Sequence, residues 1–232
     1  VFGGGFLGLD NIGVFDRSHA LPGGGYLQQA DGTAWMGFYC LTMLAIALEL
    51  ALTKPAYEDI ASKFFEHFVN ICDAINTLGG NGLWDVQDQF YYDQLIIANE
   101  PPVPLRIRSL VGLLPLCAVT VLKQKTIDAL PGFRKRMDWF LVNKPEVLKY
   151  VTANRVPGKK LSGRVLLSIP SQGRLRHTLA YMLDPKEFLS DFGIRSLSKA
   201  HDEHPFVFQY AGASHQVQYT PGEATTDMFG GN

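Results

Sequence analysis

The sequence predicts a mainly α-helical protein that forms part of an α/α toroid, with inner helices wrapped by outer ones and a short β-hairpin near the C-terminus. Two observations lead to this class. Helices that are apolar all round alternate with amphipathic helices, and the connecting loops are rich in glycine, carboxylates and aromatic residues. We expect residues 1–232 to belong to a single toroid domain that is incomplete at both ends.

The composition is that of a globular protein with a large buried fraction. Only 19% of the residues are charged, against about 25% in typical chains, and the formal net charge is −1. This balance excludes the basic surface of a nucleic-acid binder. The three cysteines lie in apolar stretches without a paired motif, so we interpret them as reduced core thiols of a cytoplasmic protein. We expect no signal peptide here, because no charged region and apolar stretch precede a cleavage site.

The first expected helix pair covers Ala34–Leu52 and Ala56–Leu78. The former has Glu49 as its only charge and is long enough to cross a membrane. We favour a buried core helix, because capping residues precede it and its flanks do not match the positive-inside pattern of a membrane span. The latter is amphipathic, with apolar residues at three- and four-residue spacing: Ile60, Phe64, Phe68, Ile71 and Ile75.

The second expected pair covers Ser109–Leu122, apolar all round with a kink at Pro115, and the amphipathic Thr126–Asn143. Alternation of period two over His204–Tyr219 predicts a hairpin. Short helices are expected at three further places, namely Pro145–Tyr150, Gln172–Met182 and Pro185–Phe192.

The residues suited to chemistry gather in the loops that lead into the inner helices. Aromatic faces together with carboxylates and amides are what a carbohydrate site needs, and two of the carboxylates could perform acid–base work across a glycosidic bond. The candidates are Asp10, Asn11, Phe15, Asp16, Gln29, Asp31, Trp35, Trp84 and Asp88.

Structural alternatives stay open for several of these residues. Asp31 could belong to the N-cap region of the following helix, and Trp84 could only fill the core. Asp85, Asp88 and Asp93 could form turns or bind calcium, although their spacing does not match an EF-hand. The six histidines have no metal-ligand spacing, and His201 and His204 favour a surface turn. We therefore expect neither a metal nor a cofactor.

Several segments together resemble the catalytic region of glycoside hydrolase family 63 and its bacterial glucosidase-like members. They are Gly3–Ser18 (GGGFLGLDNIGVFDRS), Leu27–Met36 (LQQADGTAWM), Gly82–Leu95 (GLWDVQDQFYYDQL), Arg108–Leu116 (RSLVGLLPL) and Tyr219–Asn232 (YTPGEATTDMFGGN). They occur in the family's order along nearly the whole chain. The resemblance implies an (α/α)₆ barrel and hydrolysis of an α-glucosidic or related bond with inversion.

The resemblance also implies roles for particular residues. In the family's Gly-x-Asp-Asn motif the aspartate is the general acid, and Asp10 matches it here. The segments that resemble the family's sugar-binding loops contain Asn11, Asp16, Gln29, Asp31, Trp35, Trp84 and Asp88, and we add Phe15 and Glu223 as substrate contacts. The family's general base lies beyond the end of this chain, so we expect the fragment alone to be inactive.

Two alternative functions remain. The chain could be a carbohydrate-binding or scaffold module without turnover, or a trehalase-like or debranching-type α/α-toroid hydrolase. The expected partners are an oligosaccharide or glucoside substrate, and either the missing remainder of its own barrel or a second copy. No membrane or nucleic acid is expected.

Overall fold

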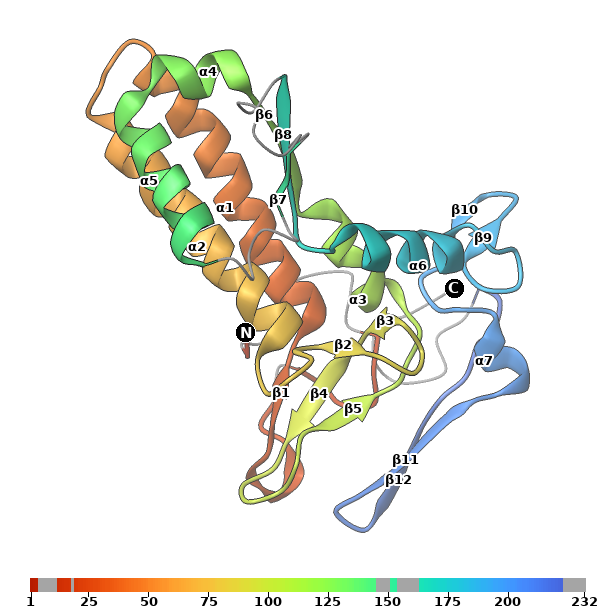
Figure 1. Cartoon of the computed structure of the whole chain (residues 1–232). Helices are drawn as coiled ribbons and strands as arrows, with labels where there is room; N and C mark the ends of the chain where they lie inside the picture. The colour runs from red at the N-terminus through yellow and green to blue at the C-terminus, as the bar shows by residue number, and fades with distance from the viewer. Residues whose placement is uncertain (4–11, 18, 145–150, 154–162, 223–232) are drawn as a thin grey trace. The chain divides into compact units, whose positions relative to one another are not determined.

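The computed structural model describes residues 1–3, 12–17, 19–144, 151–153 and 163–222. They belong to two compact units, each assembled from separate stretches of the sequence (Figure 1). The first unit comprises Val1–Thr33, Leu83–Pro115 and Arg174–Asn232, and the second comprises Ala34–Gly82 and Leu116–Gly173.

The predicted mainly α toroid is wrong. In the described part of the chain seven α-helices accompany twelve β-strands, and the strands pair antiparallel in small sheets. The error arose chiefly at Ser109–Leu122, which was expected to be one inner helix. Helix α3 (Leu110–Leu113) passes into a 3₁₀ turn (Leu114–Cys117) at Pro115, and strand β6 (Val119–Lys123) follows. Proline stops the helix, and the β-branched run after it favours a strand.

The first unit contains a three-stranded sheet with the order β1-β4-β5, formed by Tyr26–Gln28, Asp93–Ile96 and Val103–Leu105. Leu27 pairs with Leu95, which also pairs with Val103. Short hairpins complete the unit: β2–β3 (Trp84–Asp85, Phe90–Tyr91), β9–β10 (Leu189–Ser190, Gly193–Ile194) and β11–β12 (Phe206–Tyr210, Ala213–Val217). The last of these confirms the hairpin predicted near the C-terminus.

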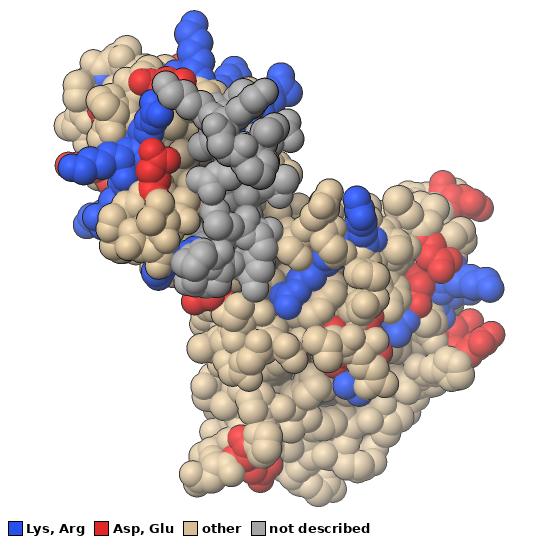
Figure 2. All heavy atoms as spheres, in the orientation of Figure 1, with Lys and Arg blue, Asp and Glu red and all other residues tan. Residues whose placement is uncertain are grey.

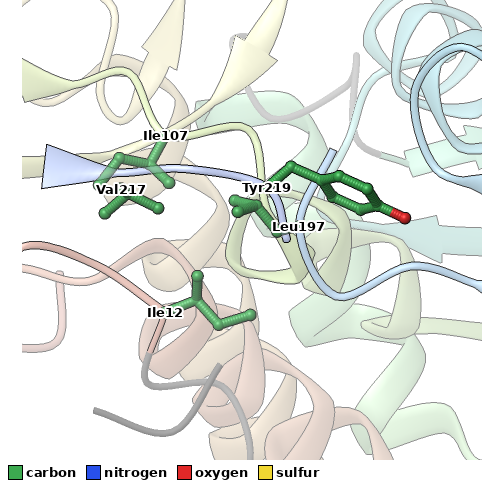
Figure 3. Close-up of a cluster of buried hydrophobic side chains, with 5 residues drawn as sticks. All are labelled: Ile12, Ile107, Leu197, Val217 and Tyr219. Atoms are coloured by element: carbon green, nitrogen blue, oxygen red, sulfur yellow. The ribbon is translucent and has the colours of Figure 1, made fainter. Parts of the chain in front are cut away.

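The core of the first unit joins distant parts of its sequence. One cluster, drawn in Figure 3, consists of five buried side chains: Ile12, Ile107, Leu197, Val217 and Tyr219. A second consists of Phe90, Tyr92, Leu113 and Phe188. Helix α6 (Gln172–Met182) has the predicted bounds, and α7 (Ala200–Glu203) is a single turn. The helix predicted at Pro185–Phe192 is not formed, because turns and strand β9 occupy that segment.

The second unit contains most of the long helix α1 (Ala30–Ala51) together with α2 (Tyr57–Thr77), α4 (Gln124–Ala129) and α5 (Pro131–Asn143). Helices α2 and α5 pack through aromatic side chains, with the Phe65 ring 5.9 Å from those of Phe133 and Phe140. The helix predicted over Thr126–Asn143 is thus broken in two at Leu130, where Pro131 starts the second helix. The helix predicted at Pro145–Tyr150 lies outside the described residues.

Helix α2 confirms the predicted amphipathic helix but shows a shifted apolar face. Ile60 is exposed and Phe64 is half-buried, whereas Phe65, Phe68 and Cys72 are buried. A three-stranded antiparallel sheet with the order β6-β8-β7 accompanies the helices, with β7 formed by Val151–Ala153 and β8 by Arg164–Ser168.

Helix α1 is confirmed, but the expectation that it is enclosed on all sides is wrong. By length and mean hydropathy (1.6) it is the one helix among the described residues that could cross a membrane, and 39% of its most apolar window is buried. Its exposed apolar side chains include Tyr39, Met43, Ile46 and Leu50. On the face drawn in Figure 2, basic and acidic side chains are interspersed over both units.

Candidate functional site

Three of the sequence segments that suggested a carbohydrate site are joined by one buried arginine. Arg17 pairs through Nη1 with the Asp31 carboxylate at 2.5 Å, and through Nη2 with the Asp93 carboxylate. Arg17 comes from the first segment, Asp31 from the first turn of α1 and Asp93 from β4. The side chains of Arg17 and Asp31 are 3% and 0% exposed, so this is an interior ion cluster.

Backbone N–H groups also donate hydrogen bonds to the two carboxylates. Asp93 Oδ1 accepts the N–H of Ala30 at 2.8 Å, and Asp31 Oδ1 accepts the N–H of Gly32 at 2.7 Å. Burial alone would lower the pKa of Arg17, but Asp93 and Asp31 outweigh it and raise this pKa above its ordinary value. Asp31 therefore acts as an ion-pair partner as well as a residue of the first helical turn. A small cavity beside Arg17, Asp93 and Ser109 has a volume of about 10 Å³, close to the space that one water needs.

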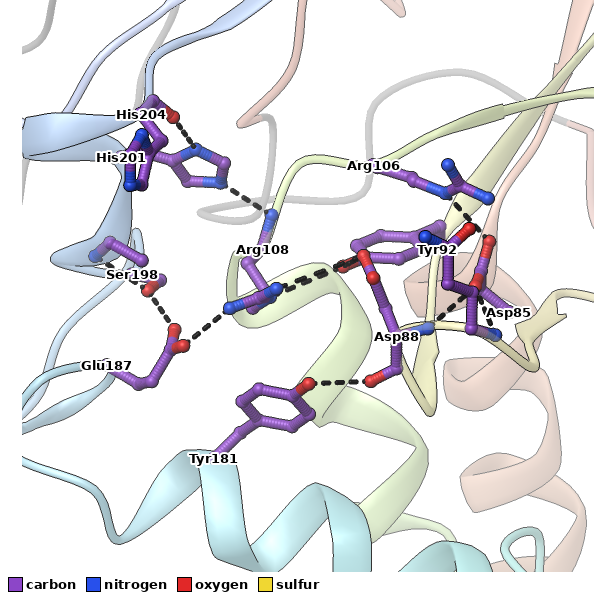
Figure 4. Close-up of polar contacts among 12 residues, drawn as sticks. Asp85, Asp88, Tyr92, Arg106, Arg108, Tyr181, Glu187, Ser198, His201 and His204 are labelled. Carbon is purple, nitrogen blue, oxygen red and sulfur yellow. Dashed lines mark hydrogen bonds and ion pairs between the residues drawn. The ribbon is translucent and has the colours of Figure 1, made fainter.

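A second polar cluster lies in the same unit and is drawn in Figure 4. It begins in the turn between β2 and β3, where Asp85 Oδ1 accepts the N–H groups of Gln87 and Asp88 at 2.9 Å each. The other Asp85 oxygen pairs with Arg106 Nε at 2.9 Å. Burial opposes ionisation of Asp85, but these hydrogen bonds and Arg106 lower its pKa overall. Asp85 is thus a turn-forming residue, one of the alternatives left open by the sequence.

Asp88, in the same turn, accepts hydrogen bonds from two tyrosine side chains. Its carboxylate accepts the hydroxyl of Tyr92 at 2.9 Å, and its backbone carbonyl accepts the hydroxyl of Tyr181, on α6, at 2.6 Å. Burial raises the pKa of Tyr92 well above its ordinary value, so this hydroxyl stays a donor. Asp88 Oδ2 also lies 3.9 Å from Nη2 of Arg108.

Arg108 is the centre of the cluster in Figure 4. Its Nη1 lies 2.5 Å from Glu187, and its guanidinium lies 4.8 Å from the centre of the Tyr181 ring. Glu187 also accepts the hydroxyl of Ser198. Arg108 and Asp88 keep 23% and 22% of their side-chain surface exposed, so solvent reaches both. The cluster therefore places one partly exposed guanidinium between the carboxylates of Asp88 and Glu187.

His201 fixes the backbone beneath this arginine. Its Nε2 accepts the N–H of Arg108 at 2.9 Å, and its Nδ1 lies 3.0 Å from the carbonyl oxygen of His204. A ring that accepts at Nε2 and donates at Nδ1 is neutral. Burial, opposed in part by the His204 carbonyl, lowers the pKa of His201. The prediction that His201 lies in a surface turn is wrong, because this residue is 8% exposed.

The aromatic candidates are divided between core and surface. Trp84 is buried, with its ring 4.8 Å from that of Tyr91 and the Arg174 guanidinium 4.9 Å from the ring centre. Phe15 is also buried, edge-on to Tyr210 at 5.3 Å. Trp35 lies in the second unit, half-buried beside Phe38 and Tyr39 on α1, whereas the other described candidates lie in the first unit.

The remaining candidates have mixed outcomes. Asp16 keeps 43% of its side chain exposed and pairs with His19 at 2.6 Å. Gln29 is buried, and its backbone N–H donates to the carbonyl of Phe2 at 2.9 Å. The candidates Asp10, Asn11 and Glu223 lie outside the described residues. Among the described residues, no group of three or more His, Cys, Asp or Glu could hold a metal ion.

Sequence reasoning missed most of the residues that hold the second cluster together. Arg108, Tyr92, Tyr181 and Glu187 are separated by up to 95 positions, and no local spacing connects them. Arg17 had a usable signal, since it follows Asp16 inside the first glycine-rich segment, a place where a buried cation needs carboxylate partners.

The comparisons with known proteins name a relative but no activity. No family model matches the chain. The chain is 50% identical over 245 residues to a protein of Saccharomyces cerevisiae named "Uncharacterized protein YMR196W", and the match covers 100% of this chain and 22% of the yeast protein. The chain thus spans about a fifth of the length of this relative.

Proposed function

We propose that the chain is a segment of the catalytic region of an inverting glycoside hydrolase that cleaves an α-linked, gluco-configured sugar, with Asp10 as general acid. The proposal starts from the motif segments that resemble glycoside hydrolase family 63. One structural observation carries it further: Arg17, Asp31 and Asp93, each from a different one of these segments, meet in one buried ion cluster. Segments that share a site have to be held together in this way.

The cluster around Arg108 supports a sugar-binding role for the same unit. A carboxylate and a guanidinium side by side offer an acceptor and a donor to neighbouring hydroxyls of a pyranose. Asp88 and Arg108 form such a pair, and both remain partly exposed. Ion pairs with Glu187 and hydrogen bonds with Tyr92 hold the two side chains in place, which reduces the entropy lost on binding.

An inverting mechanism requires a protonated general acid and a separate general base. Asp10 has to be protonated at working pH in order to donate to the leaving oxygen, which requires a pKa raised by burial or by a neighbouring carboxylate. A second carboxylate, about 6.5–9.5 Å away, has to activate the water. We propose that this base lies in another segment of a longer polypeptide, and that Asn11, Asp16 and Glu223 contact the sugar.

The decisive experiment compares Asp10→Asn with the unaltered full-length protein on two substrates. The first is an α-linked glucose disaccharide such as kojibiose, and the second is α-glucosyl fluoride, whose leaving group needs no proton. We expect kcat on the disaccharide to fall by roughly 10²–10⁴-fold, the range typical of general acid catalysis, and kcat on the fluoride to change far less. Equal losses on both substrates would remove Asp10 from this role.

Two further readouts separate the alternatives. Proton NMR of the first-formed glucose should show the β-anomer, because inversion at an α-linkage produces it, and initial release of the α-anomer would contradict an inverting mechanism. Calorimetric titration with glucose and kojibiose measures binding alone. Binding without any turnover in the full-length protein would favour the carbohydrate-binding module instead.

A further inference from the structure

An exposed apolar seam runs along helix α1. Tyr39, Met43, Ile46 and Leu50 are 58%, 40%, 48% and 39% exposed. They are spaced by four, three and four residues, so they fall on one line along the helix. Four large apolar side chains in a continuous line on a surface usually mark a site of contact rather than chance exposure.

The spacing of the residues in the seam favours a helix as the element that covers it. Apolar residues that alternate at three and four positions are the pattern by which one helix packs along another. The rest of the exposed surface of α1 is different, because it carries Thr42, Ala45 and Glu49. Lipid would contact the whole exposed side of α1, where Thr42 and Glu49 lie beside the seam, so this narrow apolar line suits a protein partner better than a bilayer.

The charge of α1 argues against a second copy of the same helix. Helix α1 contains Asp31 and Glu49 but no Lys, Arg or His, and Lys54 lies past the helix end. Pairing of two α1 helices would place no cation of either helix beside Glu49, which has no ion-pair partner within the described residues. The exposed seam also amounts to only a few hundred Å², on the order of half of the roughly 800 Å² per partner of a stable dimer.

We propose that the seam formed by Tyr39, Met43, Ile46 and Leu50 is the docking face for a helix from another segment of the same, longer polypeptide. This helix carries apolar residues at three- and four-residue spacing and a Lys or Arg opposite Glu49. A covalently connected helix can use a small face, because its effective concentration is already in the millimolar range. The yeast relative supplies the context, since this chain spans 22% of its length. The inference concerns packing and does not depend on the hydrolase proposal.

The test measures thiol reactivity at matched positions in the full-length protein. In a Cys40→Ser background, Met43→Cys places a thiol in the seam, and Thr42→Cys places one on the neighbouring exposed surface of α1. Maleimide labelling is followed by peptide mass spectrometry and normalised to the urea-unfolded protein. We expect the thiol at position 43 to react on the order of 100-fold more slowly than the one at position 42, since its reaction requires local opening.

The outcomes separate the possible occupants. Equal labelling of the two positions would overturn the proposal. Protection at position 43 that disappears on dilution, together with a dimer in light scattering, would assign the seam to a second copy and overturn it. Protection that needs phosphatidylcholine vesicles would assign the seam to a membrane and also overturn it.

A second pair of variants tests the predicted cation. Glu49→Lys should lower the melting temperature of the full-length protein, because it places a cation against the cation of the docked helix, whereas Ala45→Lys should leave it unchanged. Equal effects of the two variants would contradict the basic residue opposite Glu49.

Discussion

The guanidinium of Arg17 and the carboxylate of Asp31 lie 2.5 Å apart, with side chains 3% and 0% exposed. They come from positions fourteen residues apart in the sequence, and Asp93 closes the cluster from 76 positions further along than Arg17. The charge of each member depends on the others, because an isolated ion cannot remain in such an interior. The cluster therefore holds the N-terminal segment, the start of α1 and strand β4 in one arrangement.

The first prediction concerns the stability that this cluster provides. Arg17→Met leaves Asp31 and Asp93 buried without their cation, so it should lower the free energy of unfolding by about 3–5 kcal/mol. Arg106→Met is the matched control in the same unit. Arg106 pairs with Asp85 at 2.9 Å and keeps 43% of its side chain exposed, and pairs of exposed side chains contribute about 0.2–1 kcal/mol.

Tryptophan fluorescence during urea unfolding can follow the correct unit. Of the three tryptophans, Trp84 lies in the first unit, and Trp35 and Trp139 lie in the second. In a Trp35→Phe, Trp139→Phe background, the signal reports on the unit that contains Arg17. A loss below about 1 kcal/mol for Arg17→Met, within the range of an exposed pair, would show that the cluster does not hold this unit together.

The second prediction concerns the dependence of stability on pH. Burial lowers the pKa of His201 in the folded state, and its neutral ring accepts the N–H of Arg108. The unfolded chain then binds more protons than the folded chain once the pH falls below the unfolded pKa of about 6.5. The stability from neutral His201 is present above that pH and is lost as the pH falls toward the folded pKa, by up to about 1.4 kcal/mol per pH unit.

The measurement is the difference between variants at pH 7.5 and pH 5. His201→Gln should be less stable than the unaltered protein at pH 7.5, and the gap should narrow at pH 5. His177→Gln, at an exposed position of α6, should give a pH profile parallel to that of the unaltered protein. An unaltered slope in His201→Gln would exclude His201 as the source of the pH dependence.

Elements that depend only on the local order of apolar and polar residues were predicted correctly from the sequence. Helix α6 and the hairpin of β11 and β12 were predicted because a helix period and a two-residue alternation are local properties. The prediction of one buried helix over Ser109–Leu122 failed, because apolar character alone does not distinguish a helix from a strand, and β6 leaves Val119 and Val121 exposed. Its second half forms β6 only through pairing with β8, more than forty residues away.

The sequence indicated which types of residue form the candidate site, but not which side chains pair with one another. Asp31 and Asp88 were recognised as candidate carboxylates, and both lie in polar clusters. Their pairing with Arg17 and Arg108 depends on contacts between distant segments, which no local spacing predicts. Trp84 is held by Tyr91 and Arg174, so the alternative that it serves the core remains as important as a sugar contact.

The third prediction compares two arginines that stand two positions apart. Arg108 is half-buried and pairs with Glu187, whereas Arg106 is 43% exposed and pairs with Asp85. Arg108→Met should destabilise the protein by about 2–4 kcal/mol, because Glu187 loses its cation and keeps only the hydroxyl of Ser198 among its side-chain donors. Arg106→Met should cost about 1 kcal/mol or less, because Asp85 keeps the backbone N–H groups of Gln87 and Asp88. Thermal unfolding measures both, and equal costs would contradict the central position of Arg108 in the cluster.

The last prediction uses two glycines in helices as a matched pair. A Cβ at Gly112, in α3, would lie 2.7 Å from the Cδ1 atom of Phe90 and still closer to the carbonyl oxygen of Tyr91. A Cβ at Gly173, in α6, would meet nothing within 4 Å. Neither residue has a positive φ angle, so the two positions differ in space and not in backbone strain.

Gly112→Ala should therefore destabilise the protein by about 1–3 kcal/mol, the cost of overpacking a filled core. Gly173→Ala should stabilise it by about 0.5–1 kcal/mol, because alanine restricts the unfolded chain and favours the helix. Urea unfolding of the two variants gives both signs in one experiment. If Gly112→Ala is neutral or stabilising, α3 does not pack against the β2–β3 hairpin as closely as the structure describes, and the backbone that leads from Arg108 into the core is held in some other way.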